Sequence, residues 1–214
     1  MMDRASVNSA FAKQVADTVI ARLLPTLGLV PVGVTARHIH LCQEDINALY
    51  GKDYQLASVR KLTQPGQFIT NDFVELVGEK SSIKLRVLGP PRVATQVEIL
   101  RSDAHRIGLD APVRHSGVLD GTPGGLLRTA NGTVRISSGV IIPDRHLHLS
   151  ESEAETYGLQ DGDHIRVFIK GDRPGILDNV VVRAGKSHAL DLHLDVDDAN
   201  AFGLRQGDLL RLAK

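Results

Sequence analysis

The sequence contains one five-residue pattern twice, as RHIHL at residues 37–41 and as RHLHL at residues 145–149. In an extended strand, alternate side chains point to the same face, so the two histidines of each copy would lie side by side. On a helix, residues two positions apart do not face each other. The repeated pattern therefore predicts two strands, each of which presents a pair of imidazoles on one face.

The segments that follow the two patterns also match. Residues 150–153 read SESE, and a serine followed three residues later by a glutamate is the capping box that begins a helix. Residues 42–45 read CQED and have the same form, with Cys42 in the place of the serine. We therefore expect each strand to run directly into a helix. We interpret Cys42 as a helix-start residue rather than as a metal ligand or a nucleophile.

The duplication continues further along the chain. Residues 97–109 align with residues 192–204, and the two segments share Asp, Ala, Gly and Leu at four aligned positions. In this alignment Glu98 falls opposite His193. Each half of the chain thus combines a His-x-His strand with one further candidate ligand on another strand.

These residue types are ligands that zinc and related metals use, and a catalytic site commonly has three protein ligands with one position left open. A single His-x-His pair is weak evidence, because such a pair more often lies on a surface or in a core. Two copies in matching repeats favour two metal sites. The candidate ligands are His38, His40 and Glu98 in the first half and His146, His148 and His193 in the second. We assign the other histidines with no such context to surface or packing roles, namely His105, His115, His164 and His188.

Most of the chain after residue 30 consists of short segments that alternate in polarity or are rich in β-branched residues, as strands are. These segments are 74–77, 83–88, 93–100, 164–170, 179–184, 189–196 and 208–212. Short helices are expected at 43–50, 103–107, 151–157 and 197–202. Many short strands with few helices favour a barrel or a sandwich, so we predict a mainly β fold.

The composition excludes several classes of protein. The 214 residues include 25 basic and 25 acidic side chains, so no field of one sign exists to attract nucleic acid. No apolar run approaches the roughly 20 residues of a membrane span. The single cysteine excludes an internal disulfide and fits a reducing compartment. We expect a soluble intracellular protein that binds neither nucleic acid nor membrane.

Five apolar residues near the N-terminus recur at four-residue steps and predict a helix with an apolar stripe, which Pro25 would end. They are Val7, Phe11, Val15, Val19 and Leu23. The helix either packs on the protein's own surface or is a detachable tag that docks to a partner. Arg22 and the lack of a small-residue cleavage site argue against a secretory signal.

The glycine-rich stretch GTPGGLL at residues 121–127 is a candidate boundary between the two halves. We therefore expect an N-terminal helix within residues 1–24, a first repeat over residues 30–120 and a second repeat over residues 121–214. The sequence contains no P-loop, no dinucleotide glycine motif and no G-x-S-x-G nucleophile elbow.

Several ordered motifs resemble one known family. VGVTARHIHL at 32–41, GPPR at 89–92, APVRHSG at 111–117 and RHLHL at 145–149 are similar to motifs of the PduL-type phosphate propanoyltransferases, phosphotransacylases of bacterial microcompartments. The resemblance extends from about residue 31 to the C-terminus. It implies two small β-barrels from an internal duplication, short capping α-helices, an active site between the barrels and two zinc ions. It also implies that the first strand joins the barrel made largely by the C-terminal half.

The resemblance assigns roles to individual residues. It implies that the first ligand set binds the zinc that meets the sulfur of coenzyme A, and that the second set binds the other zinc. Arg92 matches the phosphate-binding arginine of the family, and Ser116 matches a position that offers its backbone N–H to the reacting carbonyl. The implied reaction converts a short-chain acyl-CoA, propanoyl-CoA above all, and phosphate into acyl phosphate and CoA. No nucleophile with a nearby base is visible, which favours direct transfer.

The N-terminal helix also has a counterpart in the family, whose encapsulated members carry an amphipathic helix that directs them into microcompartments. Residues 4–24 would then contact a shell protein, and the protein would lie in the microcompartment lumen; without such a tag it would be cytoplasmic. The sequence leaves the oligomeric state open, with a homodimer as one alternative.

Other functions compete with this interpretation. His38, His40, Glu44 and Gly51 nearly reproduce the first motif of the cupins, which bind iron or manganese. A cupin, however, needs its glutamate on the continuing strand. A non-catalytic, zinc-stabilised module is a second alternative, although closed four-ligand sites would be expected there. A zinc thioesterase, with water in place of phosphate, is a third.

Overall fold

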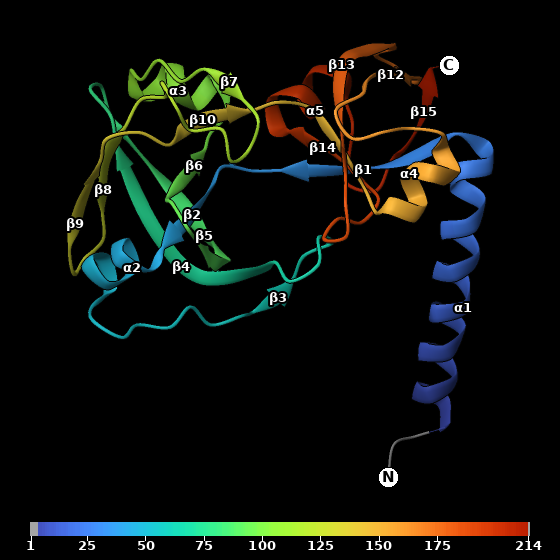
Figure 1. Ribbon diagram of the computed structural model, residues 1–214, viewed down its shortest axis with the longest axis horizontal. Helices are drawn as coiled ribbons and strands as arrows, with labels where there is room; N and C mark the ends of the chain where they lie inside the picture. Colours follow the sequence, from blue (N-terminus) through green and yellow to red (C-terminus); the bar gives the residue numbers. More distant parts are fainter. Residues whose placement is uncertain (1–3, 214) are drawn as a thin grey trace.

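A computed structural model of the chain describes residues 4–213, and the side chains of residues 12, 15, 16, 18–20 and 22–213. The fold is mainly β, as the sequence predicts, and consists of two units that lie side by side with a long helix projecting from one of them (Figure 1). None of the described helices is both long enough and apolar enough to span a membrane.

One unit is a closed six-stranded barrel, in which each strand is hydrogen-bonded to the next and the last to the first. Its strands, in order around the barrel, are β1 (Leu29–Thr35), β14 (Asp191–Asp195), β11 (His146–Leu149), β13 (Gly175–Ala184), β12 (His164–Ile169) and β15 (Leu209–Ala213). Closure leaves the barrel without an unpaired edge.

The other unit is an open sheet of nine strands. In order across the sheet, its strands are β7 (Val113–Arg114), β10 (Val140–Pro143), β6 (Gln96–Glu98), β2 (His38–Cys42), β5 (Ser82–Arg92), β4 (Phe68–Val77), β8 (Gly125–Arg128) and β9 (Thr133–Ile136), with β3 (Arg60–Lys61) paired to β4. The resemblance implied two barrels, whereas this unit curves without closing, because its terminal strands β7 and β9 each pair on one side only. The change of sheet falls between β10 and β11, and the glycine-rich stretch at 121–127 instead leads into the β8–β9 hairpin.

The two units exchange their leading strands. β1 immediately precedes β2 in the chain but lies in the closed barrel, parallel to β14, as the blue strand among the orange and red strands of Figure 1 shows. β10 immediately precedes β11 but lies in the open sheet, parallel to β6. The exchange is therefore reciprocal, and neither sheet is complete without a strand contributed by the other half of the chain.

The duplication is visible in the strand register. β2 lies between β5, which is parallel to it, and β6, which is antiparallel; β11 lies in the same way between β13 and β14. As a result, His38 lies opposite Glu98 in one sheet, and His146 lies opposite His193 in the other. The aligned third ligands therefore occupy equivalent positions beside the first histidine of each pair.

The same kind of ion pair is found at the two places where the chain crosses between the units. Arg37 Nε lies 2.8 Å from Asp103 Oδ2 at the first crossing, and Arg145 forms a two-point ion pair with Asp198, at 2.6 and 2.8 Å, at the second. Both aspartates lie in the first turn of a helix. Each arginine thus ties a crossing to the helix that follows the third ligand of its half.

Four short helices follow the ligand-bearing strands. They are α2 (Gln43–Tyr50), α3 (Arg101–Ile107), α4 (Glu151–Tyr157) and α5 (Val196–Phe202). Ser150 begins α4 with a capping box, in which its side chain accepts a hydrogen bond from the Glu153 N–H. Cys42 is the N-cap residue of α2, but its sulfhydryl forms no capping hydrogen bond with the helix backbone. Both helices nevertheless begin directly after the strand, as expected.

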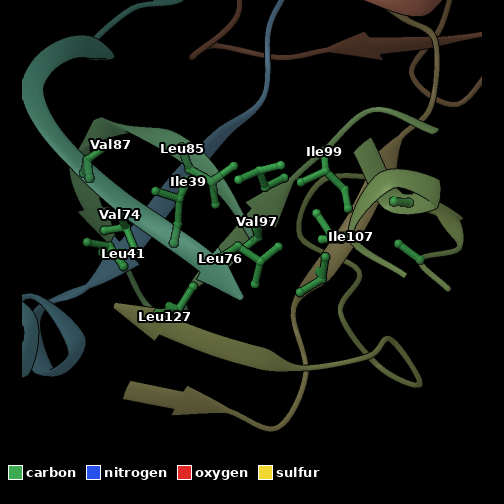
Figure 2. Close-up of a cluster of buried hydrophobic side chains, with 14 of the residues drawn as sticks. Ile39, Leu41, Val74, Leu76, Leu85, Val87, Val97, Ile99, Ile107 and Leu127 are labelled. Atoms are coloured by element: carbon green, nitrogen blue, oxygen red, sulfur yellow. The ribbon is translucent and has the colours of Figure 1, made fainter. Parts of the chain in front are cut away.

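Each unit has its own apolar core. Figure 2 shows the core of the open sheet, where Ile39 and Leu41 of β2 meet Leu76 of β4 and Val97 of β6. In the barrel, Leu147 and Leu149 of β11 are fully buried. The apolar residues of the His-x-His strands thus point into the cores, which leaves the histidines on the opposite face.

The N-terminal helix α1 (Arg4–Leu27) extends beyond the end that the sequence indicated. Pro25 lies in its final turn, where its missing N–H removes one backbone hydrogen bond without ending the helix, and the helix ends at Gly28, whose φ of 62° is left-handed. α1 packs mainly against α4 and β1. Val15, Val19 and Leu23 of the apolar stripe are about half exposed, while the side chains of Val7 and Phe11 lie outside those that the structure describes.

Substitution of Leu147 by alanine should destabilise the barrel, because this side chain is fully buried in the barrel core. In the sequence, Leu147 lies between the ligand histidines His146 and His148. We expect the free energy of unfolding, measured by denaturant titration, to fall by about 2–5 kcal/mol. Ile176→Ala, on β13 of the same barrel and 51% exposed, is the matched control and should cost less than about 1 kcal/mol. Equal losses in the two variants would contradict this description of the core.

Candidate active site

The first set of candidate ligands forms one cluster. His38 and His40 point from β2, and Glu98 from the adjacent strand β6, so that potential ligand atoms of all three lie within 4.8 Å of one another. His38 Nε2 lies 3.3 Å from Glu98 Oε2. All three side chains are largely buried. Strand alternation thus brings together two residues of one strand and one of its neighbour.

The second set forms an equivalent cluster in the barrel. His146 and His148 point from β11 and His193 from β14, and their potential ligand atoms also lie within 4.8 Å of one another. The three ring centroids are 4.7–5.0 Å apart. Among the described residues, both clusters contain three such side chains rather than the four of a closed structural site.

The first histidine of each pair is oriented by a backbone carbonyl at the crossing. His38 Nδ1 donates to the Ala36 carbonyl oxygen, and His146 Nδ1 donates to that of Asp144, both at 2.8 Å. A protonated Nδ1 leaves the Nε2 lone pair available to the cluster, which is how metal-ligating histidines are commonly held. The crossings therefore fix the same ring orientation in both halves.

The second histidine of each pair is neutral. Burial, the neighbouring histidine and the charge of Arg92 lower the pKa of His40 well below its ordinary value. Burial and the surrounding imidazoles likewise lower the pKa of His148. In both rings Nδ1 is buried without a hydrogen-bond partner. A neutral imidazole keeps one nitrogen lone pair with which it can bind a metal ion, so both rings fit metal sites.

Glu98 is ionised in this setting. Burial raises its pKa, but the charges of nearby groups, Arg92 among them, lower it by more, to about 2. The carboxylate is further held by Gln96, whose Nε2 donates to Glu98 Oε1 at 2.5 Å. One carboxylate beside two histidines matches the donor set of many catalytic metal sites.

Gln96 connects the first cluster to the loop that carries Ser116. The fully buried amide also donates to Ser116 Oγ at 2.7 Å and accepts from the Gly117 N–H at 2.7 Å. Both the Nε2 and the Oε1 atoms of the Gln96 side chain are therefore used, and together they fix the position of Glu98 relative to this loop. Gln96 is a positioning residue that the sequence interpretation missed.

Asp191 occupies the position equivalent to Gln96 in the barrel, because it lies opposite His148 as Gln96 lies opposite His40. Its buried carboxylate is 3.1 Å from His193 Nε2. The supporting residue differs between the two halves together with the third ligand. In the first half the amide of Gln96 holds the carboxylate of Glu98, and in the second half the carboxylate of Asp191 holds the imidazole of His193. Gly33 of β1 gives it room, since a Cβ there would lie 2.8 Å from Asp191 Cγ.

Arg92 and Ser116 lie together next to the first cluster. Arg92 donates from one terminal nitrogen to His40 Nε2 at 2.9 Å and from the other to Ser116 Oγ at 3.1 Å. The guanidinium is oriented by these two contacts and is partly buried. It is therefore placed to bind an anion next to the candidate metal ligands.

Both clusters line one cavity of about 780 Å³ at the junction of the two units. A cavity of this size holds a ligand as large as a cofactor. Its wall also carries seven basic side chains against two acidic ones, in a chain whose net charge is zero. The basic residues are Arg37, Arg60, Lys61, Lys84, Arg86, Arg92 and Arg183. This concentration of positive charge favours a substrate with several negative charges.

Some features depart from the sequence interpretation. His188, assigned to surface or packing, lines the cavity and stacks on His148 with ring centroids 4.5 Å apart. Glu44 lies in helix α2 and is exposed, so it does not join the first cluster as a cupin would require. Gln96 and Asp191 precede the third ligands by two residues, and the same strand alternation that revealed the His-x-His pairs would have indicated them.

The part of the chain that contains both clusters is similar to one protein family. A family model described as phosphate propanoyltransferase matches residues 31–205. A phosphate propanoyltransferase of Thermotoga maritima is 46% identical over 164 residues, which cover 76% of this chain and 78% of the relative. Relatives with the same name from Alkaliphilus metalliredigens and Listeria monocytogenes are 42% and 41% identical and cover 77% and 87% of this chain, and 78% and 88% of their own lengths.

Replacement of Gln96 by the isosteric glutamate should weaken metal binding at the first cluster. The new carboxylate cannot donate to Glu98 and repels it, so we expect an affinity for Zn²⁺ about 10–100-fold lower, measured by chelator competition. The exposed Gln55→Glu is the matched control and should bind as the unaltered protein does. Zn²⁺ binding by Gln96→Glu that equals the control would contradict the positioning role.

Proposed function

Because the chain belongs to the phosphate propanoyltransferase family, an acyltransferase family, we propose that it interconverts propanoyl-CoA and phosphate with propanoyl phosphate and CoA. The observation that carries this proposal is the single cavity onto which both three-residue clusters and Arg92 open. Such a cavity allows one reaction to use both clusters and a bound anion at the same time.

The proposal includes two zinc ions. His38, His40 and Glu98 would hold one, and His146, His148 and His193 the other. The neutral rings of His40 and His148 and the ionised carboxylate of Glu98 support this assignment. When bound, zinc would supply positive charge that stabilises a thiolate and an oxyanion. The chain's own contribution is to orient these ligands through the Ala36 and Asp144 carbonyls, Gln96 and Asp191.

In the forward reaction an oxygen of hydrogen phosphate attacks the thioester carbon, a C–O bond forms and the C–S bond breaks. The electron pair leaves with the CoA sulfur, and the proton of hydrogen phosphate balances the thiol product. Arg92 holds the phosphate with its paired N–H donors, and the loop at Ser116, which it contacts, lies beside the reacting carbonyl. Positioning of two bound substrates is the main source of rate in such a transfer.

The basic wall of the cavity suits the remainder of CoA, which carries a pyrophosphate and a further phosphate group. Lys84 and Arg86 lie over Phe73, 4.0 and 4.4 Å from its ring centroid, and Arg60 and Lys61 of β3 line the same cavity. These four residues are the candidate contacts for the CoA phosphates.

Direct transfer between the bound substrates is the route that the residues favour. The only cysteine, Cys42, begins helix α2 and is not among the residues that line the cavity. A covalent acyl-cysteine is therefore not part of the proposal.

We also propose that α1 directs the protein into the lumen of a bacterial microcompartment by contacting a shell protein. The helix projects from the barrel, as Figure 1 shows, and Val15, Val19, Ile20 and Leu23 on it are about half exposed. Leu24, in contrast, is buried against the body of the protein. These four half-exposed apolar side chains are thus accessible to a partner.

The reaction can be tested by release of free CoA thiol from propanoyl-CoA, with and without phosphate, by the zinc-loaded protein. We expect release only with phosphate. Arg92→Gln should reduce the phosphate-dependent rate by about tenfold or more, since it removes a charge-assisted contact. Arg135→Gln, an exposed arginine of the same sheet, is the control and should keep full activity. Equal release without phosphate would contradict the proposal and identify a thioesterase.

The role of α1 can be tested by deleting residues 1–22, which retains the buried Leu24. We expect the truncated protein to keep its catalytic rate but to separate from shells purified from a microcompartment-forming bacterium, where the full chain co-purifies. A full-length variant with Val19→Ser and Leu23→Ser keeps the helix and should behave like the deletion. Retention of both variants in the shells, or loss of folding on deletion, would contradict the tag.

A further inference from the structure

Arg183 lies on the barrel side of the cavity, in a strand equivalent to the one that carries Arg92. It belongs to β13 and is the register neighbour of His148 on β11. β5, which carries Arg92, is parallel to β2 in the same way. Arg183 is half-buried and lines the same cavity as both clusters. Each cluster therefore has an arginine beside the second histidine of its pair.

Both arginines meet at one residue. Arg183 donates from a terminal nitrogen to the Ser116 carbonyl oxygen at 3.4 Å, while Arg92 donates to the hydroxyl of the same serine at 3.1 Å. The two contacts reach Ser116 from different units of the molecule. The guanidinium groups are thus held close together across the junction, with the loop at Ser116 between them.

The charges of this pair are offset only in part. Among residues 4–213, neither Arg92 nor Arg183 forms an ion pair with an acidic side chain. Glu98 lines the same cavity, and its oxygens contact His38 and Gln96. Two like charges at short range in a partly buried site are costly, and a bound dianion relieves that cost.

The location distinguishes this pair from the other basic residues of the cavity. Lys84 and Arg86 gather at Phe73, on the open sheet, whereas Arg92 and Arg183 gather at Ser116, between the two clusters. Hydrogen phosphate carries two charges and enough oxygens to accept from both guanidinium groups at once.

We propose that Arg183 is a second phosphate-binding residue, which with Arg92 holds inorganic phosphate between the two ligand clusters. In the reverse direction the same pair would hold the phosphoryl group of the acyl phosphate. The inference rests on the proposed phosphotransacylase function, and it assigns the phosphate to a position that both halves of the duplicated chain build together.

The test compares Arg183→Gln and Arg183→Lys with Arg166→Gln, an exposed arginine on the neighbouring strand β12 that pairs with Asp178 at 3.3 Å. Initial rates of CoA release are measured against phosphate and against propanoyl-CoA. For Arg183→Gln we expect the KM for phosphate to rise about 10–100-fold and the KM for propanoyl-CoA to stay within about twofold. Arg183→Lys should lie between, and Arg166→Gln should match the unaltered protein. A fall in kcat with no change in the KM for phosphate, or an equal rise in both KM values, would overturn the proposal.

Calorimetric titration of the zinc-loaded protein with inorganic phosphate separates this inference from the proposed function, because it requires no turnover. Weaker phosphate binding by Arg183→Gln than by Arg166→Gln supports the anion site, even if the unaltered protein releases no CoA. Equal phosphate binding by the two variants overturns the role of Arg183, even if the protein is an active phosphotransacylase. Thermal unfolding of each variant identifies loss of folding, and Arg183→Lys then decides the outcome.

Discussion

The reciprocal exchange of β1 and β10 is the constraint on which the rest of this structure depends. It forces the chain to cross between the two units twice, and each crossing is anchored by an arginine–aspartate ion pair, Arg37–Asp103 and Arg145–Asp198. The residue after each arginine is the first histidine of a His-x-His pair. Both pairs therefore begin at the junction of the units, and one cavity receives two equivalent clusters.

The distribution of charge in the cavity follows from this arrangement. Burial and mutual proximity keep His40 and His148 neutral, so their ring nitrogens remain available as ligands, while Glu98 supplies a negative charge. The positive charges lie around the clusters rather than in them. The duplication has preserved the register of the supporting residues while changing their chemistry, so that Gln96 matches a carboxylate ligand and Asp191 matches an imidazole.

The periodicity of the sequence predicted the features that depend on strand alternation, namely the mainly β class and the grouping of the candidate ligands. The mainly β class is confirmed, and the family that the motifs indicated is shown by the comparisons. The two sets of candidate ligands do come together, because strand alternation and internal alignment already encode register; their role as zinc ligands stays a prediction. The sequence did not indicate that β10 is exchanged as well as β1, or that one sheet stays open, because both depend on long-range pairing. Helix α1 does not end at Pro25, as the sequence indicated, but at the left-handed Gly28, three residues further on. His188 was missed because only the folded loop brings it to His148.

The most direct measurement of this account is a crystal structure of the zinc-loaded protein with anomalous diffraction at the zinc absorption edge. The account predicts two anomalous peaks in the single cavity, one within about 2.0–2.3 Å of ligand atoms of His38, His40 and Glu98 and the other equally close to His146, His148 and His193. One peak alone, or peaks on residues outside these two clusters, would contradict the claim that the duplicated crossings build two metal sites into one active site.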